Sequence, residues 1–206
     1  ITNPNNPTGL PLDPGALLTF LERVPEKCVV VLDEAYTDFM DEKLRTPSFE
    51  WVKRFPNLLV TRTFSKAYGL AGLRAGFGVA NKELIEMMNR IRPPFNMNAA
   101  AQAAAVAALD DQAFLRKVVQ TNAKERARLA AFFDELKLVQ LPSQANFIMV
   151  HVGPEAAEIN EAMLRKGVIL RPLKSYGLPE YMRISVGSPE ENDIFMKAFR
   201  EMLSAL

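Results

Sequence analysis

Apolar residues in the first half of the chain occur both as short continuous runs and at helical spacing. The run Cys28-Val29-Val30-Val31-Leu32 is rich in β-branched residues, which is typical of a buried parallel strand that ends at Asp33. The same reasoning predicts two further strands and two helices, over 58–62, 75–80, 13–24 and 82–91. This alternation predicts a doubly wound α/β layer, in which ligands gather at the carboxyl ends of the strands.

The second half has a different order of elements. An alanine-rich helix is expected over 98–109, followed by a long amphipathic helix over 112–136. A strand, a helix, two strands and a helix should then follow, over 146–152, 156–166, 168–171, 182–186 and 189–203. We therefore expect a large α/β domain over 1–120 and a small α+β domain over 121–206.

Composition and charge narrow the class of protein. The 206 residues are 49% apolar and 24% charged, which is ordinary for a soluble globular protein. A formal net charge of +1 gives no reason to expect nucleic acid or a membrane as a partner. The single cysteine, Cys28, rules out an intrachain disulfide and suits a reducing compartment; because it opens an apolar run, we expect a buried, inert thiol.

The strongest chemical signal is Lys66, within Thr63-Phe64-Ser65-Lys66 and followed eight residues later by Arg74. A lysine amine becomes a covalent catalyst when it forms a Schiff base with an aldehyde, and pyridoxal phosphate is the commonest such cofactor. The hydroxyls of Thr63 and Ser65 and the guanidinium of Arg74 are groups that hold a phosphate. A solvated surface lysine is the alternative interpretation for Lys66 taken alone.

Two segments upstream could meet the other needs of that cofactor. A carboxylate must keep its ring nitrogen protonated, and Asp33 follows a predicted strand. Its phenolic oxygen needs hydrogen-bond donors, for which Asn6 and Tyr36 are candidates. The alternatives are a turn cap for Asp33, an ordinary turn around Asn6 and simple packing for Tyr36.

These motifs, in this order, resemble those of the fold-type I aminotransferases: Asn-Pro-Thr-Gly at 6–9, Asp-x-Ala-Tyr at 33–36 and Thr-x-Ser-Lys at 63–66. Across 61–74, 167–172 and 178–187 the sequence is particularly similar to the histidinol-phosphate aminotransferase family, and the likeness covers essentially the whole chain. The resemblance implies a pyridoxal-phosphate enzyme of histidine biosynthesis that exchanges the amino group of L-histidinol phosphate with 2-oxoglutarate. It also implies a cytoplasmic homodimer.

The resemblance further implies roles for single residues. Lys66 would hold the cofactor and then move the proton between the substrate Cα and the cofactor. Arg183 would bind the substrate carboxylate, and Arg171 the anionic distal group. Family members are longer, and the part that would precede Ile1 supplies the aromatic residue stacked on the cofactor, further phosphate contacts and a tyrosine from the partner subunit.

Other interpretations stay open from the sequence. An aromatic-amino-acid aminotransferase and a phosphate-recognising decarboxylase of the same fold would share these motifs, and Arg171 and Arg183 could be surface ion-pair residues. A non-catalytic dimerisation module is a further alternative. The only histidine, His151, has no Cys or His partner nearby in the sequence, which favours a partly buried structural role over a metal site.

Overall fold

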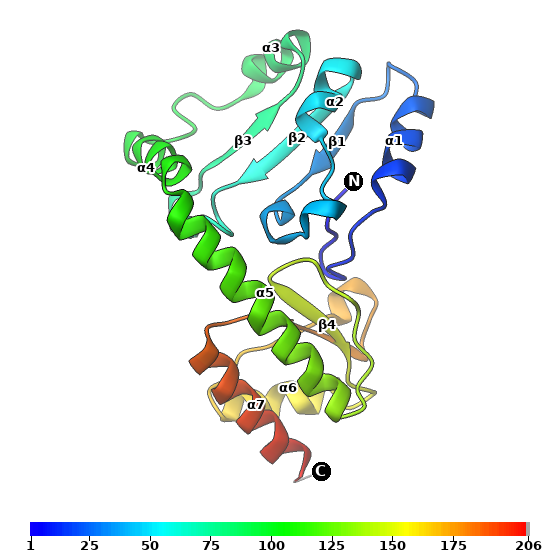
Figure 1. Cartoon of the computed structure of the whole chain (residues 1–206), viewed down its shortest axis with the longest axis vertical. Helices are drawn as coiled ribbons and strands as arrows, with labels where there is room; N and C mark the ends of the chain where they lie inside the picture. Colours follow the sequence, from blue (N-terminus) through cyan, green and yellow to red (C-terminus); the bar gives the residue numbers. More distant parts are fainter. Residues whose placement is uncertain (205–206) are drawn as a thin grey trace. The chain divides into compact units, whose positions relative to one another are not determined.

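The computed structural model describes residues 1–204, which form two compact units (Figure 1). The first unit consists of Ile1–Pro4 and Pro11–Val119, and the second of Asn5–Leu10 and the chain from Gln120 onward. The long helix α5 (Gln112–Glu135) begins in the first unit and continues in the second. The segment 5–10, which precedes the first predicted helix, therefore belongs to the second unit.

The first unit is built on a sheet of β1 (Val30–Asp33), β2 (Leu58–Thr63) and β3 (Gly76–Val79), in that order. β1 pairs with β2 in parallel, and β3 pairs with β2 antiparallel. The three predicted strands are confirmed to within two residues at each end. An isolated parallel bridge from Thr2 to Asp33 lies beyond β1.

One face of this sheet is covered by α1 (Pro14–Arg23) and α2 (Ser48–Arg54). Because side chains alternate across a strand, every second residue of β1 and β2 points to that face. The resulting core consists of buried apolar residues from the two helices and the two strands: Leu17, Leu21, Val30, Leu32, Trp51, Val52, Phe55, Leu58 and Val60.

The opposite face of the sheet carries Asp33, Thr61 and Thr63, which occupy the alternate positions. Thr61 and Thr63 lie opposite Gly78 and Gly76 of β3, so no side chain of β3 covers them. This face is partly open, and its apolar residue Val31 is 43% exposed.

The expectation that Cys28 is buried is wrong, because its thiol is exposed. The strand begins two residues later than predicted, at Val30. Cys28 instead lies in a turn, where its backbone N–H donates to the carbonyl of Pro25 at 2.8 Å. An apolar run therefore overstates burial at its first residue, which lies outside the ladder.

Short polar side chains fix where the helices of the first unit begin. Asp13 accepts a hydrogen bond from the backbone of Ala16 at the start of α1. Asn81 and Asn98 cap α3 (Lys82–Ile91) and α4 (Ala99–Asp110) in the same way. Each satisfies a backbone N–H that the first turn leaves unpaired. All three helices start within one residue of the prediction.

The second unit contains a sheet in the order β4 (Phe147–His151), β6 (Tyr181–Ser185) and β5 (Arg171–Pro172). Both pairings are antiparallel. The helices α6 (Ala156–Arg165) and α7 (Pro189–Leu203) complete the unit. The order of elements expected for a small α+β domain is confirmed.

The strand predicted over 168–171 is wrong apart from its last residue. Gly167 ends α6 with a positive φ of 79°, and the backbone N–H of Val168 donates to Met163 rather than to a strand. β5 pairs with β6 only at Arg171 and Pro172. Proline has no N–H to donate, which limits the ladder to this short bridge.

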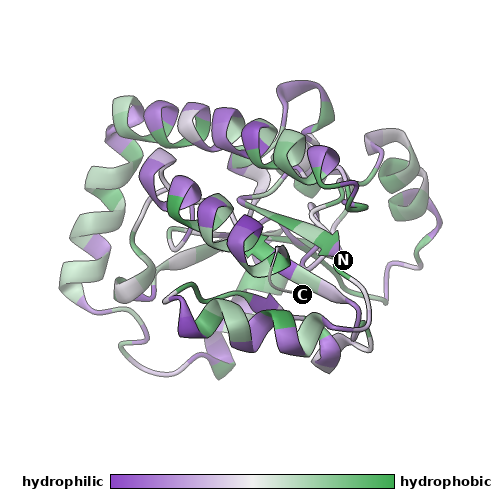
Figure 2. Ribbon diagram, turned by 90° about the horizontal axis from the view of Figure 1, so that it is seen from below, coloured by the Kyte–Doolittle hydropathy of each residue, from purple (hydrophilic) through white to green (hydrophobic). Residues whose placement is uncertain are grey.

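One apolar core fills the second unit between α5, α6, α7 and one face of the sheet. Its centre is a cluster of aromatic rings packed at centroid distances of 5.4–6.5 Å, formed by Phe132, Phe133, Phe195 and Phe199. Polar and apolar residues alternate along the helical ribbons, as expected of helices with one buried face (Figure 2). α7 begins with a capping box formed by Ser188 and Glu191.

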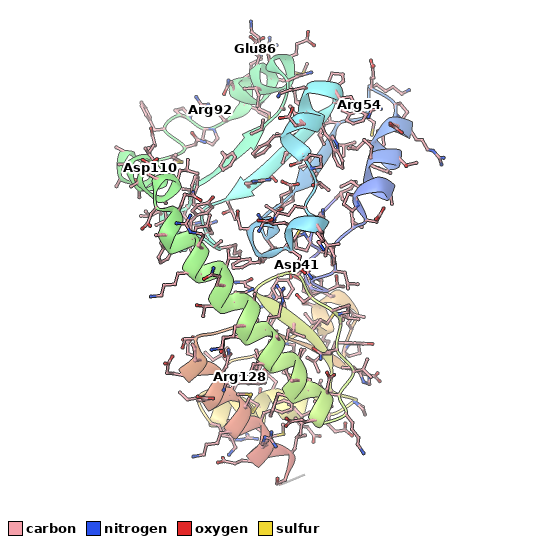
Figure 3. All side chains as sticks on the ribbon, in the orientation of Figure 1. Asp41, Arg54, Glu86, Arg92, Asp110 and Arg128 are labelled. Carbon is pink, nitrogen blue, oxygen red and sulfur yellow. The ribbon has the colours of Figure 1, made fainter. Side chains whose placement is uncertain are left out.

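A buried carboxylate links two helices of the second unit. Glu125 of α5 is 1% exposed and accepts hydrogen bonds from Arg128 and Asn192, both at 2.9 Å. Arg128, labelled on α5 in Figure 3, also pairs with Asp193 of α7. Glu125 and Arg128 of α5 therefore hold the start of α7 through Asn192 and Asp193.

Single turns of 3-10 helix complete the described elements, at Thr37–Phe39, Glu42–Leu44, Ala71–Leu73 and Lys174–Tyr176. Within residues 1–204, no helix combines the length and apolar character needed to cross a membrane.

Candidate active site

Lys66 projects from the turn that follows β2. Its neighbours Phe64 and Ala67 are buried, and Phe64 packs against the alanine-rich helix α4. The backbone N–H of Gly69 donates to the carbonyl of Lys66 at 3.0 Å, which closes the turn. Buried residues on both sides thus anchor a segment whose lysine side chain itself is exposed.

The amine of Lys66 lies over the aromatic ring of Tyr36, which follows β1. Its Nζ is 5.2 Å from the ring centroid of Tyr36, a distance that permits a cation–π interaction. Tyr36 is buried at 8% exposure, so the ring is a fixed surface for the flexible lysine. The structure therefore brings together two of the candidate residues, from segments that are 30 positions apart.

Asp33 is held at the carboxyl end of β1. Its backbone N–H donates to Ile1 and its carbonyl accepts from Asn3, while its carboxylate accepts from the backbone N–H of Ala35 at 3.0 Å. The side chain is half-buried on the open face of the sheet. In the ladder Asp33 lies opposite Thr61, two residues before Thr63. Asp33 and Thr63 thus occupy the same face at the ends of neighbouring strands.

Thr63, Ser65 and Arg74 form a second group beside Lys66. The hydroxyl of Thr63 accepts from the backbone N–H of Ser65 at 3.0 Å, which shapes the turn. The guanidinium of Arg74 donates to the hydroxyl of Ser65 at 3.3 Å and to the carbonyl of Ala71 at 2.9 Å. An exposed guanidinium next to a hydroxyl is a donor set that fits a phosphate group.

The backbone of Arg74 supports a role for its side chain. Arg74 has φ = 54°, in the left-handed region where residues with a Cβ are disfavoured by about 1–2 kcal/mol. Glycine would avoid that cost. Strained residues of this kind cluster at active sites and ligand clamps. Phe95 and Lys137 have the same conformation in this chain.

The remaining candidate residues, Asn6, Arg171 and Arg183, belong to the second unit. Arg183 of β6 donates from Nη1 to Oδ1 of Asn6 at 2.8 Å, and its guanidinium carbon lies 4.9 Å from the ring centroid of Phe147. Its Nε is buried and has no partner in the described structure. This hydrogen bond uses the oxygen of the Asn6 amide and leaves the Nδ2 end as its donor group.

Arg171 is the direct ladder partner of Arg183. Opposed residues of an antiparallel pair point to the same face, so the two guanidinium groups share one face of the sheet. The core residues Met182 and Ile184 point to the other face. Two cations on one face, close to an amide, form an arrangement suited to anionic groups.

Sequence reasoning missed a buried ion pair directly beside the candidate residues. Glu34, next to Asp33, is 1% exposed and binds Arg62, next to Thr63. Alternation along the strands could have found it, since Glu34 and Arg62 follow the buried residues Leu32 and Val60 at intervals of two.

Two titratable groups of the first unit, Asp38 and Tyr68, have altered acidity. Burial raises the pKa of Asp38 above its usual range, although Arg62 and Arg45 counteract this. Burial also raises the pKa of Tyr68, and the negative charge of Asp38 adds to that effect. Both groups thus resist ionisation more than they would in water.

His151 lies at the end of β4, where Nε2 is 3.0 Å from a carboxylate oxygen of Glu180 and the ring packs edge-on against Tyr181. Its side chain is 36% exposed. The expected partial burial is confirmed.

Residues 1–199 match the aminotransferase class I and II family. The chain is 49% identical over 202 residues to histidinol-phosphate aminotransferase 1 of Idiomarina loihiensis, covering 98% of this chain and 55% of that protein. It is 52% identical over 207 residues to histidinol-phosphate aminotransferase 2 of Ralstonia nicotianae, covering 99% and 55%. The chain thus spans about half the length of the curated relatives it matches.

Among solved structures, the fold matches histidinol-phosphate aminotransferase from Sinorhizobium meliloti in complex with pyridoxal 5'-phosphate. The TM-score is 0.89 at 32% identity, covering 98% of this chain and 57% of that one. The chain therefore belongs to the aminotransferase class I and II family. The fold-type I α/β architecture and the family expected from the motifs are confirmed.

Proposed function

We propose that this chain carries the cofactor-binding and substrate-binding residues of a pyridoxal-phosphate-dependent aminotransferase. Its substrates would be L-histidinol phosphate and 2-oxoglutarate, and it would act in histidine biosynthesis as a cytoplasmic homodimer. The observation that carries the proposal is the grouping around Lys66: Tyr36 under its amine, with Ser65 and Arg74 in the same segment. The family membership, the names of the relatives and the cofactor of the Sinorhizobium protein support it.

Each polar group of the cofactor has a candidate partner in the first unit. When bound, pyridoxal phosphate supplies a reactive aldehyde and a ring that accepts electrons from a carbanion. Arg74 and Ser65 would bind the phosphate, with the hydroxyl of Thr63 shaping their turn. The carboxylate of Asp33 would hold a proton on the ring nitrogen, because a nearby negative charge favours the protonated form.

The amine of Lys66 would bind the aldehyde carbon covalently and, once released, move a proton to and from the substrate Cα. Tyr36 lies against that amine, and its hydroxyl would donate to the phenolic oxygen of the cofactor. Asn6 is proposed as a cofactor ligand through its Nδ2 group, since its Oδ1 accepts from Arg183.

Arg183 would bind the carboxylate of glutamate, the product of 2-oxoglutarate amination. The planar guanidinium suits such bidentate contacts, and the buried Nε of Arg183 is a donor that a carboxylate could satisfy. Arg171, its ladder partner, would bind the distal anionic group. That group is the phosphate of histidinol phosphate or the side-chain carboxylate of glutamate.

Chemical trapping on Lys66 tests the proposal. The chain is incubated with pyridoxal phosphate, reduced with borohydride, digested and analysed by mass spectrometry. We expect a single major pyridoxyl group, located on Lys66 and absent from Lys66→Ala. Lys82→Ala, which removes an exposed lysine of α3, is the matched control and should label normally. Equal labelling of surface lysines in the wild type and Lys66→Ala would instead favour the non-catalytic module.

The amino donor distinguishes the enzyme alternatives. Rates of 2-oxoglutarate-dependent transamination with histidinol phosphate and with phenylalanine should favour histidinol phosphate. Arg171→Met should reduce that preference, because it removes one cation from the pair. A preference for phenylalanine would assign the chain to the aromatic-amino-acid aminotransferases.

A further inference from the structure

Glu34 is a buried carboxylate whose oxygens are both engaged. Its Oε1 accepts from the hydroxyl of Thr46 at 2.8 Å, and its Oε2 from the hydroxyl of Ser48 at 2.9 Å. Arg62 donates to Oε2 from Nε at 3.0 Å and from Nη2 at 2.8 Å. The side chain of Glu34 is completely shielded from solvent. A buried charge is tolerated when it is paired and hydrogen-bonded in this way.

Arg62 is held from two further directions. Its guanidinium carbon lies 4.3 Å from the ring centroid of Phe49, in a cation–π contact. Its carbonyl faces Gly76 so closely that a Cβ on Gly76 would lie 2.9 Å from that oxygen. Both the side chain and the backbone of Arg62 are therefore fixed.

The pair spans the ends of two parallel strands at the candidate site. The backbone N–H of Glu34 donates to the carbonyl of Thr61 at 2.9 Å, which continues the ladder past β1. Because side chains alternate, Glu34 and Arg62 point to the covered face, while Asp33 and Thr63 point to the open face. Any sliding or splaying of the strand ends would change the separation of Asp33 and Thr63.

Stability alone is a weak explanation for this pair. Replacing a buried ion pair by apolar residues of similar size is often neutral or stabilising. Beyond Glu34, Arg62 and the hydroxyls of Thr46 and Ser48, this face continues into the apolar core of Leu32 and Val60. An ion pair with fixed geometry does constrain the relative position of two strands more narrowly than apolar contacts do.

We infer that Glu34 and Arg62 are positioning residues that set Asp33 and Thr63 for the cofactor. This inference rests on the proposed function, since it gives Asp33 the ring nitrogen and Thr63 the phosphate-binding turn. Neither Glu34 nor Arg62 touches the cofactor itself. They act through the residues beside them in the sequence, on the other side of the sheet.

The test measures cofactor binding in variants matched for stability. Glu34→Gln keeps an acceptor for Thr46 but removes the charge that binds Arg62. Glu34→Gln/Arg62→Met removes the ion pair without leaving an unpaired buried charge. The control is Glu125→Gln, which weakens a comparably buried pair with Arg128 in the second unit. Urea unfolding of each variant establishes how much stability is lost.

The dissociation constants of pyridoxal phosphate and of pyridoxal, which lacks the phosphate, are then compared. We expect both Glu34 variants to bind pyridoxal phosphate at least about tenfold more weakly, a loss of the size found when the groups that orient metal ligands are removed. The pH midpoint of the bound-cofactor absorbance should also move, because Asp33 is displaced from the ring nitrogen. Glu125→Gln should bind normally and keep that midpoint.

The possible outcomes separate the two proposals. If the wild type fails to label at Lys66, the proposed function fails and the positioning role fails with it. If the wild type labels but the Glu34 double variant binds normally at equal stability, the positioning role alone is overturned. Arg62→Lys keeps the charge but loses the planar guanidinium. Its affinity for pyridoxal phosphate should lie between those of the wild type and the double variant.

Discussion

The two units stabilise themselves in different ways. The second unit has one continuous apolar core of fourteen buried residues, four of which are the phenylalanines of the aromatic cluster. The first unit has smaller clusters around its sheet, of nine and four buried residues, and an ion pair whose carboxylate is fully buried extends one of its apolar faces. Two candidate cofactor residues, Asp33 and Thr63, lie on the open face of that sheet. The unit that holds most of the candidate cofactor residues thus has the less continuous apolar core.

Polar side chains have different roles in the two units. In the second unit, polar groups mainly cap or fasten helices, as Ser188 and Glu125 do. In the first, Asp33 and Thr63 are the last residues of their strands and Lys66 lies in the turn after β2, so the residues that shape the sheet's edge are also candidate site residues. A substitution in the first unit should therefore affect binding and stability together more often than one in the second.

The largest effect should come from Phe199→Ala in the core of the second unit. Phe199 is fully buried and contacts three other rings of the aromatic cluster. Truncation of such a phenylalanine typically costs about 3–5 kcal/mol of unfolding free energy. Urea unfolding followed by circular dichroism should show the loss. The fluorescence of Trp51, the only tryptophan and a core residue of the first unit, should shift less.

The control for this prediction is Ile194→Ala on the same helix. Ile194 is 61% exposed, so its removal should change the unfolding free energy by no more than about 0.5 kcal/mol. An equal shift of both probes in Phe199→Ala would contradict the separation into two cores.

A medium effect is expected from Gly9→Ala, which tests the assignment of 5–10 to the second unit. A Cβ at Gly9 would lie 2.1 Å from the hydroxyl oxygen of Ser143, and φ there is 73°. Strain of this kind costs about 1–3 kcal/mol. The loss should appear by circular dichroism and not in Trp51 fluorescence.

Gly177→Ala isolates the backbone part of that cost. Gly177 has nearly the same φ, 75°, but no atom within 4 Å of the added Cβ. The difference between the two variants measures the clash with Ser143. Equal losses in both would show that the segment 5–10 can move away from its partner.

The smallest effect should come from Asp38→Asn in the first unit, and it should depend on pH. Burial raises the pKa of Asp38, so the folded state holds its proton more tightly than the unfolded chain does. Ionised Asp38 therefore destabilises the fold above that raised pKa, and the penalty vanishes as the pH falls through it. Asp38→Asn should raise the urea midpoint of Trp51 fluorescence at neutral pH, with no gain in acid.

Glu190→Gln in the second unit should change stability with pH in the opposite direction to Asp38→Asn. Hydrogen bonds from its own backbone and from Ser188 lower the pKa of Glu190. Its charged form is favoured by folding, so Glu190→Gln should lower stability at neutral pH, and the deficit should fade as the pH falls through the lowered pKa. The same direction of pH dependence in both variants would contradict the assigned environments.

Periodicity predicted most of the fold because local signals and packing agree. α3 and α7 have the expected bounds, and their caps and prolines fix those ends. Errors arose where burial depends on long-range pairing. Cys28 lies just outside the ladder and is exposed, and Pro172 limits the strand expected over 168–171.

The candidate site was predictable as a set of motifs but not as contacts. The structure groups Lys66 with Tyr36, Ser65 with Arg74, and Asn6 with Arg183. The roles assigned to these residues stay predictions. The Glu34–Arg62 pair went unrecognised because Glu34 lies beyond the end of the predicted strand, and its alternation with Leu32 becomes evident only when the ladder is seen to continue past Asp33.

Residues 5–10 belong to the second unit although the residues on both sides of them belong to the first, and this affects how the chain is synthesised and folded. Gly9 accepts from the backbone of Gln144, and Asn6 from a residue 177 positions away. On a ribosome adding about 5–20 residues per second, this segment waits on the order of ten seconds for its partners. Neither unit can be expressed as one uninterrupted stretch of sequence. The late contacts of Asn6 and Gly9 should thus be among the last steps of folding, after the two sheets have formed.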